Sequence, residues 1–268
     1  MPEHAAESPS DIESFTRIAG NQAAGLILLC DHARNTLPSG YDSLGLPTNE
    51  FQRHIAFDIG AEAVTRGLAA RLGSIAFLTA YSRLLIDPNR GLDDPTLIMK
   101  LSDGAVVPGN RNIDAAERQR RIDRYYLPYH MAITREIDTL IGAGIRPILV
   151  SIHSFTPFWK TIPRPWHAGI LWDRDGRLPH LLLDGLQRDK SLVVGDNEPY
   201  HGALEGDTLN THGTRRGLAH ALIEIRQDLI AEQSGVDEWV DRLALILEPV
   251  MKEPGLRREA SIASQYGP

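Results

Sequence analysis

Short apolar runs alternate with longer amphipathic stretches along the chain. Residues 25–30 (GLILLC) and 147–152 (PILVSI) are short, continuous apolar runs, which predicts two buried strands. Further strands are expected over 74–79, 84–86, 168–172, 192–194 and 219–225. Apolar positions at helical spacing predict helices over 49–72, 114–140, 181–187 and 228–251. This alternation indicates an α/β fold with helices layered around a mainly parallel sheet.

The pattern also divides the chain into regions. Residues 1–20 are polar and acidic and are expected to form a flexible arm, followed by a single domain over 21–252 and a tail over 253–268. Residues 91–112 are rich in Gly and Asp and are expected to form a long loop. Loops of that length are often functional.

Composition excludes several classes of protein. The formal net charge is −7 and no basic stripe is present, which argues against nucleic acid as a partner. The single cysteine, Cys30, excludes an intramolecular disulfide and a zinc–thiolate cluster. The chain shows neither a secretory signal pattern nor an apolar run long enough for a membrane, so a cytoplasmic location is expected.

Two histidines are the first candidates for chemistry. His32 comes soon after the run that ends at Cys30, and His153 directly follows the run that ends at Ile152. Ligands of open α/β sheets bind in the crevice outside the carboxyl ends of the strands. Two imidazoles that converge there would suit a divalent metal such as zinc. Alternatively, each ring caps its strand and donates to a carbonyl.

Two further residues could complete a metal site. Asn35 is close enough to His32 in sequence to reach the same ion, although an Asx turn is the commoner role for a loop asparagine. Asp58 lies within the predicted helix 49–72, where an Asp next to an apolar run is unfavourable. It could ligate the metal directly or orient a metal-bound imidazole, or it could lie on a solvated face.

The segment 81–90 carries candidate substrate-binding groups. Arg83 precedes a short apolar run, and Asp87, Asn89 and Arg90 follow it. Asn89 and Arg90 could bind a substrate carboxylate in a bidentate manner. The alternative is a surface pair between Arg83 and Asp87 beside a turn.

A carboxylate interrupts the last predicted strand. Glu224 stands within an apolar run, where a charge is costly unless it is paired or functional. Next to a metal it could take a proton from water and deliver it to a leaving amine. The alternative is a buried ion pair with Arg226 or Arg216; Arg226 shares a face with Glu224 by strand alternation. Tyr200 and His201 could close over a substrate or simply pack against the body of the protein, and His212 is a further secondary candidate.

Taken in order, these segments resemble the N-formylglutamate amidohydrolase family over roughly residues 20–235. The resemblance rests on His32–Asn35 with Pro38, Asp58–Gly60, Ser82–Arg83 with Asp87–Arg90, Ser151–Ser154 and Ile223–Arg226. That family is similar in turn to zinc carboxypeptidases and aspartoacylases. The resemblance implies a three-layer αβα sandwich of the phosphorylase/hydrolase type.

The resemblance also implies roles for the candidate residues. His32 and His153 would bind Zn²⁺ or another divalent metal, and Glu224 would be the general base. Arg83 would polarise the scissile carbonyl, while Asn89 and Arg90 would bind the substrate carboxylate. Arg226 and Tyr200, to which the resemblance gives no role, are further candidates for substrate binding. Asn35 stands where the wider pattern has a Glu ligand, so the third ligand is either Asn35 or Asp58.

The reaction expected from this resemblance is metal-dependent hydrolysis of a small anionic N-acyl amino acid, with N-formylglutamate as the first candidate. Two alternatives remain. Ser151 or Ser154 could act as a nucleophile, although the chain contains no Gly-x-Ser-x-Gly motif. A non-catalytic relative that has lost the metal could instead bind an acidic or N-acyl amino acid.

Overall fold

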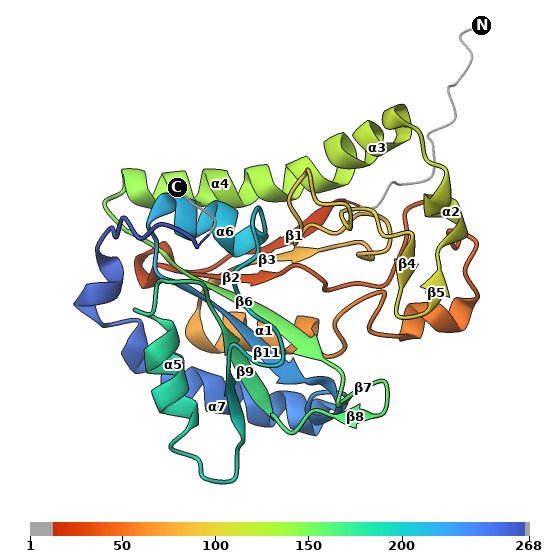
Figure 1. Ribbon diagram of the computed structural model, residues 1–268. Helices are drawn as coiled ribbons and strands as arrows, with labels where there is room; N and C mark the ends of the chain where they lie inside the picture. The colour runs from red at the N-terminus through yellow and green to blue at the C-terminus, as the bar shows by residue number, and fades with distance from the viewer. Residues whose placement is uncertain (1–12, 266–268) are drawn as a thin grey trace, which may run out of the picture.

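A seven-stranded mixed sheet forms the middle layer of the computed structural model, which describes residues 13–265 (Figure 1). Its strand order is β1-β3-β2-β6-β11-β9-β10. Strand β1 is antiparallel to β3 and β9 is antiparallel to β11, whereas the other neighbours are parallel. The strands are β1 (Phe15–Ile18), β2 (Leu26–Cys30), β3 (Ile75–Thr79), β6 (Ile148–Phe155), β9 (Ala168–Leu171), β10 (Val194–Asp196) and β11 (His220–Arg226).

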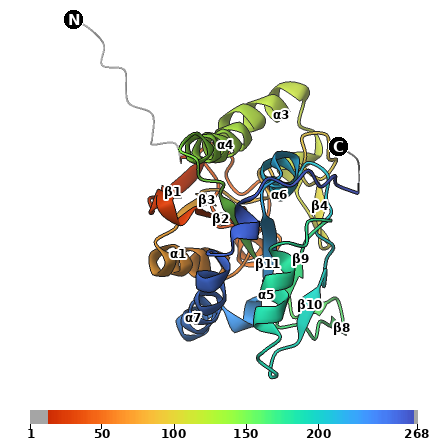
Figure 2. The ribbon, with the colours of Figure 1, turned by 90° about the vertical axis from the view of Figure 1, so that its left-hand side faces the viewer.

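Helices cover both faces of this sheet (Figure 2). One face packs against α1 (Ala61–Leu72), α5 (Pro179–Leu186) and α7 (Gln233–Val250), and the other against α4 (Leu127–Gly142) and α6 (Thr208–His212). The alternation of side chains along β2 separates the two cores: Leu26 and Leu28 belong to the first, Ile27 and Leu29 to the second. The predicted three-layer α/β architecture is confirmed.

The remaining elements are short. The helix predicted over 114–140 is present as α3 (Ala115–Arg121), a π-helical turn (Ile122–Tyr126) and α4. The predicted loop 91–112 contains the hairpin β4 (Leu101–Ser102) with β5 (Ala105–Val106), and α2 (Pro108–Arg111). A second hairpin pairs β7 (Phe158–Trp159) with β8 (Ile162–Pro163). The 3₁₀ turns are Gln22–Ala24, Thr48–Gln52, Thr214–Arg216, Gln227–Leu229 and Pro254–Arg257.

Two predicted elements near the site are wrong. The helix expected over 49–72 begins only at Ala61, because Gly60 adopts φ +80° and breaks the apolar pattern into a turn and a helix. A Cβ at Gly60 would lie 2.2 Å from the carbonyl oxygen of Ile230, so this entry into α1 requires glycine. The strand expected over 84–86 is a turn, although its side chains are buried as the apolar run predicted.

The central strand and the chain ends also differ from expectation. Strand β6 continues to Phe155, because β11 pairs with it as far as that residue, so His153 lies within the strand. Residues 15–18, inside the expected flexible arm, form β1; residues 1–12 of that arm lie outside the described residues. In the expected tail, the Arg257 guanidinium donates to the carbonyl oxygens of Ala24, Gly25, Arg146 and Met251. Among the described residues, no helix is both long and apolar enough to cross a bilayer.

Candidate metal centre

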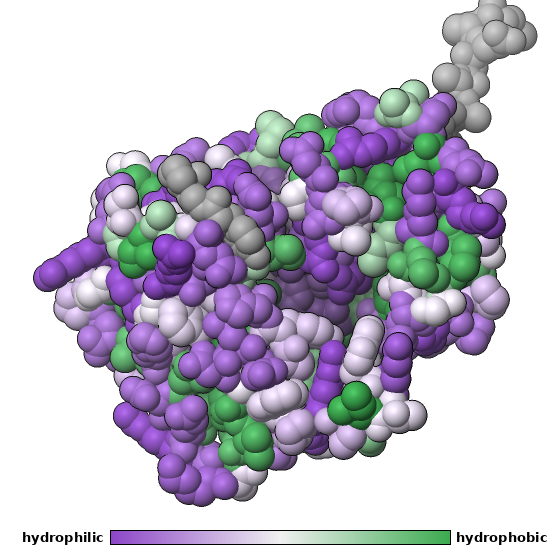
Figure 3. All heavy atoms as spheres, viewed as in Figure 1, coloured by the Kyte–Doolittle hydropathy of each residue, from purple (hydrophilic) through white to green (hydrophobic). Residues whose placement is uncertain are grey.

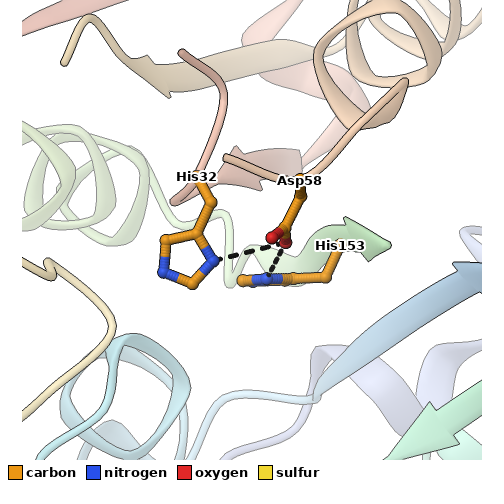
Figure 4. A group of neighbouring side chains, drawn as sticks. All are labelled: His32, Asp58 and His153. Carbon is orange, nitrogen blue, oxygen red and sulfur yellow. Dashed lines mark hydrogen bonds and ion pairs between the residues drawn. The ribbon is translucent and has the colours of Figure 1, made fainter. Parts of the chain in front are cut away.

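Three buried side chains meet at the carboxyl ends of the central strands (Figure 4). His32 lies in the turn after β2, Asp58 in the turn before α1, and His153 near the end of β6. Nδ1 of His32 is 3.3 Å and Nδ1 of His153 is 2.8 Å from Oδ2 of Asp58. The Asp58 N–H donates to the His32 carbonyl oxygen at 2.9 Å, which ties the two turns together. Two imidazoles and a carboxylate form a donor set that zinc accepts.

A second carboxylate holds the far nitrogen of each ring. Nε2 of His32 is 2.8 Å from Oδ1 of Asp87, and Nε2 of His153 is 3.1 Å from Oδ2 of Asp31. A carboxylate in this position accepts the Nε2–H, so the Nδ1 of a neutral ring carries a lone pair. Both lone pairs then face the Asp58 oxygen with no hydrogen between them. A proton on each ring or a shared cation resolves this arrangement. Burial would lower the pKa of His153, but its hydrogen bonds to Asp31 and Asp58 raise it well above its usual value, so a proton takes this place when no metal is bound. A divalent cation among the three side chains would replace such protons, and the donor set fits one.

Asp31 anchors the centre to both sides of the fold. Besides His153, its carboxylate accepts hydrogen bonds from Tyr129 in α4, Ser151 in β6 and Thr208 in α6, each at 2.9 Å. Burial alone would raise the pKa of Asp31, but the hydrogen bond and charge of His153 lower it well below its usual value. Ser151 is fully buried in this network and does not line the cavity, which leaves it no access to a substrate.

Arg83 balances the negative charge of Asp87. Its Nε and Nη2 lie 3.0 and 2.6 Å from Oδ2 of Asp87, and its Nη1 lies 3.6 Å from Oδ1 of Asp58. Burial would raise the pKa of Asp87, whereas the Arg83 charge holds it well below the usual range. The ion pair between Arg83 and Asp87 that the sequence suggested does form, but it is not at the surface, because Asp87 is fully buried. The guanidinium instead belongs to the lining of the site.

A cavity of about 400 Å³ opens above this centre, and Figure 3 shows a hydrophilic hollow on the same side of the molecule. The volume lies in the lower part of the range of about 300–1,000 Å³ for small-molecule sites. The structure brings most of the candidate residues together around it. Its lining includes His32, Asp58, Arg83, Asn89, Arg90, His153, Tyr200, His201 and Glu224.

Glu224 has the environment of a proton carrier. It is the register partner of His153 in the neighbouring strand and is only 6% exposed. Within residues 13–265 its Oε2 has no hydrogen-bond partner, and burial raises the pKa of this carboxyl to about 7. The buried ion pairs considered from the sequence do not form, because Arg226 pairs with Asp228 and Arg216 with Asp138.

Asn89 and Arg90 are oriented by their neighbours. Oδ1 of Asn89 accepts from the Thr208 N–H at 3.1 Å, which leaves its amide N–H groups as donors toward the cavity. Arg90 bonds to Thr96 Oγ1 through Nε and to the Asn89 carbonyl oxygen through Nη1. Among residues 13–265 no carboxylate lies within ion-pair distance of Arg90. It is therefore the lining guanidinium available to a carboxylate ligand.

Three candidates lie outside the cavity lining. The amide of Asn35 donates to the Phe51 carbonyl oxygen at 2.8 Å, a local turn role, and Asp58 takes the place beside the histidines. The Arg226 guanidinium bonds to Asp228 at the end of β11. His212 contacts His130, Nε2 to Nδ1 at 2.9 Å, in the layer behind Pro88.

Sequence reasoning gave no role to Asp31 or to Asp207, which also lines the cavity. Asp31 directly precedes His32, and an acid next to a candidate ligand was the available signal. Burial raises the pKa of Asp207 to about 7, while its carboxylate accepts from the Asn210 N–H at the start of α6. Nothing in the local sequence distinguishes Asp207 from an ordinary helix cap.

The contact between Asp87 and His32 makes a testable prediction. Asp87→Asn is expected to weaken Zn²⁺ binding about 10- to 100-fold, because the amide accepts less strongly from Nε2–H and orients the ring less well. A competition titration with a chromophoric chelator measures this affinity. The control is Asp207→Asn, since Asp207 lines the cavity without a hydrogen bond to either ring. Equal affinities for Asp87→Asn and the unchanged protein would contradict the role assigned to Asp87.

The fold and this cavity define an α/β protein with a buried His–Asp–His site beside a carboxyl of raised pKa. The profile of the N-formylglutamate amidohydrolase family matches residues 24–231, and the chain belongs to that family. The resemblance stated from the sequence is thereby confirmed, and the family supports amide hydrolysis as the reaction.

Two solved structures are similar over nearly the whole chain. The gene product Atu2144 from Agrobacterium tumefaciens is 33% identical, with a TM-score of 0.83, over 89% of this chain and 95% of its own. An N-formylglutamate amidohydrolase from Ralstonia eutropha JMP134 is 25% identical, with a TM-score of 0.66, over 92% of this chain and 99% of its own. No curated protein matches the chain.

Proposed function

We propose that the chain is a metal-dependent amidohydrolase that cleaves a small N-acyl amino acid, with N-formylglutamate as the first candidate substrate. The observation that carries the proposal is the convergence of His32, Asp58 and His153 next to a buried, unpartnered Glu224. The family match and the N-formylglutamate amidohydrolase from Ralstonia eutropha support the same reaction.

His32, Asp58 and His153 would hold the cation. A bound divalent ion would polarise the scissile carbonyl and lower the pKa of the attacking water. Asp87 and Asp31 contact the Nε2 atoms of the two rings, which would leave each Nδ1 to bind the ion. Asn35 stands where the wider family pattern has a Glu ligand and carries no charge. Asp58 would supply the negative charge at the metal in its place.

Glu224 would move the proton. Its Oε2 has no partner to displace, and a pKa of about 7 allows it both to accept a proton from water and to deliver it to the leaving amine. Tyr200 lies on the same cavity and its ring could cover the bound substrate.

Two arginines would each face a different negatively charged group of the substrate. Arg90, with the Asn89 amide, would bind the carboxylate of the amino acid, since no carboxylate of the described part of the chain pairs with this guanidinium. Arg83 is fixed by Asp87 and Asp58 and therefore presents a preorganised positive charge to the oxyanion that develops at the carbonyl.

The test is formate and glutamate release from N-formylglutamate by three preparations: zinc-loaded protein, chelator-treated protein, and chelator-treated protein to which zinc is returned. We expect turnover in the first and third and its loss in the second. Stoichiometric zinc with no turnover of any N-acyl amino acid would instead indicate a non-catalytic binding protein. Turnover that survives complete removal of the metal would contradict the metal dependence.

A further inference from the structure

One wall of the cavity is aromatic. Phe155, Trp159 and Tyr200 all contribute to the lining, and they come from three different segments: the end of β6, the hairpin β7–β8 and the loop before Gly202. Trp159 and Tyr200 remain 44% and 42% exposed. Exposed aromatic side chains grouped at the mouth of a polar site commonly mark a binding surface for an apolar group.

A single guanidinium holds the three rings. The Cζ atom of Arg164 lies 5.9 Å from the ring centroid of Phe155, 5.4 Å from that of Trp159 and 4.8 Å from that of Tyr200. Arg164 is 9% exposed, and its Nη1 bonds to the Thr156 hydroxyl at 3.1 Å. Such cation–π contacts keep the rings in place without a ligand, so the wall is preorganised.

The wall lies beyond the reacting groups, away from the carboxylate-binding residues. His153 and Phe155 are two residues apart on the same strand, so both face the cavity, with Phe155 about 7 Å further along β6. A chain of hydrogen bonds leads from the His153 ring to the start of α6: Nε2 contacts Asp31, and Asp31 accepts from the Thr208 hydroxyl. The Thr208 N–H in turn donates to Asn89. Asn89 and Arg90 therefore lie toward α6, and the aromatic wall lies at the open end of β6.

This placement indicates which end of a substrate would lie at each end of the cavity. With the amino-acid carboxylate at Asn89 and Arg90 and the amide beside His153 and Glu224, the acyl group points toward the aromatic wall. A formyl group has no carbon beyond the carbonyl and would offer that wall no apolar surface. Three rings held by one arginine would then have no apolar group to pack against in an N-formyl substrate.

We propose that this chain hydrolyses N-acyl amino acids whose acyl group is larger than formyl and apolar, with that group packed against Phe155, Trp159 and Tyr200. The inference rests on the proposed hydrolysis of an N-acyl amino acid, and it replaces formyl, the first candidate acyl group there, with a larger apolar one. The amino-acid end is unaffected, since Asn89 and Arg90 bind it in the same way for every acyl group.

The experiment is an acyl series on one amino acid: N-formyl-, N-acetyl-, N-butyryl- and N-hexanoylglutamate, assayed as kcat/KM with zinc-loaded protein. We expect kcat/KM to rise along the series, with the hexanoyl compound at least tenfold above the formyl compound, a gain of the size that added methylenes give in apolar sites. A Trp159→Ala variant is expected to reduce this ratio about tenfold.

The matched control is Phe158→Ala. Phe158 is the neighbouring residue of the same hairpin and is 55% exposed, but it does not line the cavity. Its replacement is expected to leave the hexanoyl-to-formyl ratio unchanged. A ratio that falls equally in both variants would point to a disturbed hairpin and would overturn the assignment of Trp159.

A calorimetric binding measurement on the Glu224→Gln variant separates this inference from the proposed function. Tighter binding of N-hexanoylglutamate than of N-formylglutamate, lost in Glu224→Gln/Trp159→Ala, supports the aromatic wall even where no compound is turned over. Turnover that is highest for the formyl compound, with equal binding of both, overturns the inference and leaves amide hydrolysis intact.

Discussion

Glu224→Gln is expected to reduce kcat by about 10²- to 10⁴-fold while the zinc content stays unchanged, because in the proposed mechanism Glu224 carries the proton and lies outside the His32–Asp58–His153 group. The same variant is expected to be more stable than the unchanged protein when both are free of metal. Burial raises the pKa of Glu224 from 4.5 to about 7, so folding is coupled to protonation of this group.

The sign of the stability effect follows from that shift. As the pH rises above 4.5, the unfolded chain loses its proton first, and the folded state becomes progressively less favoured until about pH 7. A glutamine stays neutral throughout. At pH 8, Glu224→Gln is therefore expected to raise the free energy of unfolding by up to about 3 kcal/mol, with little gain at pH 4.

Urea unfolding of chelator-treated protein at the two pH values measures this difference. Glu253→Gln is the control, since Glu253 is exposed and lies in the segment after α7. A loss of activity without any stability gain at pH 8 would contradict the buried, unpartnered state of Glu224. Activity within threefold of the unchanged protein would contradict its catalytic role.

Asp58→Asn is expected to remove stoichiometric zinc and, with it, activity, whereas Asn35→Ala is expected to retain both. Asp58 Oδ2 contacts Nδ1 of both histidines, while the Asn35 amide is engaged with the Phe51 carbonyl oxygen. Loss of a direct ligand is expected to exceed the roughly 10- to 100-fold effect of an outer carboxylate. Asn35→Ala loses one hydrogen bond, with a cost of about 1 kcal/mol in stability.

Zinc content after dialysis against a defined zinc buffer measures the difference between these two variants. Thermal unfolding, with and without zinc, gives an independent measure, because an ion that binds only the folded state raises the unfolding temperature. If Asn35→Ala loses zinc and Asp58→Asn retains it, the third ligand is Asn35 and the geometry assigned to Asp58 is wrong.

The pattern of apolar residues was sufficient to predict the layers of the fold. Runs such as 25–30 and 147–152 are buried on both faces in the parallel part of the sheet, so they read as continuous apolar segments. The failures occurred where a local backbone feature overrides the pattern. Gly60 breaks an apolar periodicity that continues across it, and the run at 84–86 forms a buried turn instead of a strand of the sheet.

Candidate residues of the site could be predicted where a short segment of sequence is enough to identify them. His32, His153 and Glu224 each stand at the edge of or inside an apolar run, a position that marks a functional polar group. The choice between Asn35 and Asp58 depends on which turn packs against His32, and this is a tertiary contact. Arg226 followed from strand alternation, but β11 ends there and its side chain turns to Asp228.

The network around Asp31 also has a consequence for how the protein is made. The hydrogen bond between Asp31 and Thr208 spans 177 residues, and β2 pairs with β6 about 120 residues downstream. During synthesis, β2 therefore emerges long before β6, with apolar side chains and an unpaired backbone edge that β6 does not yet cover. Such non-local pairing slows folding, because a long loop must close before the contacts that stabilise it can form. The centre is thus among the last parts to assemble, and fragments that end before β11 are expected to be aggregation-prone and inactive.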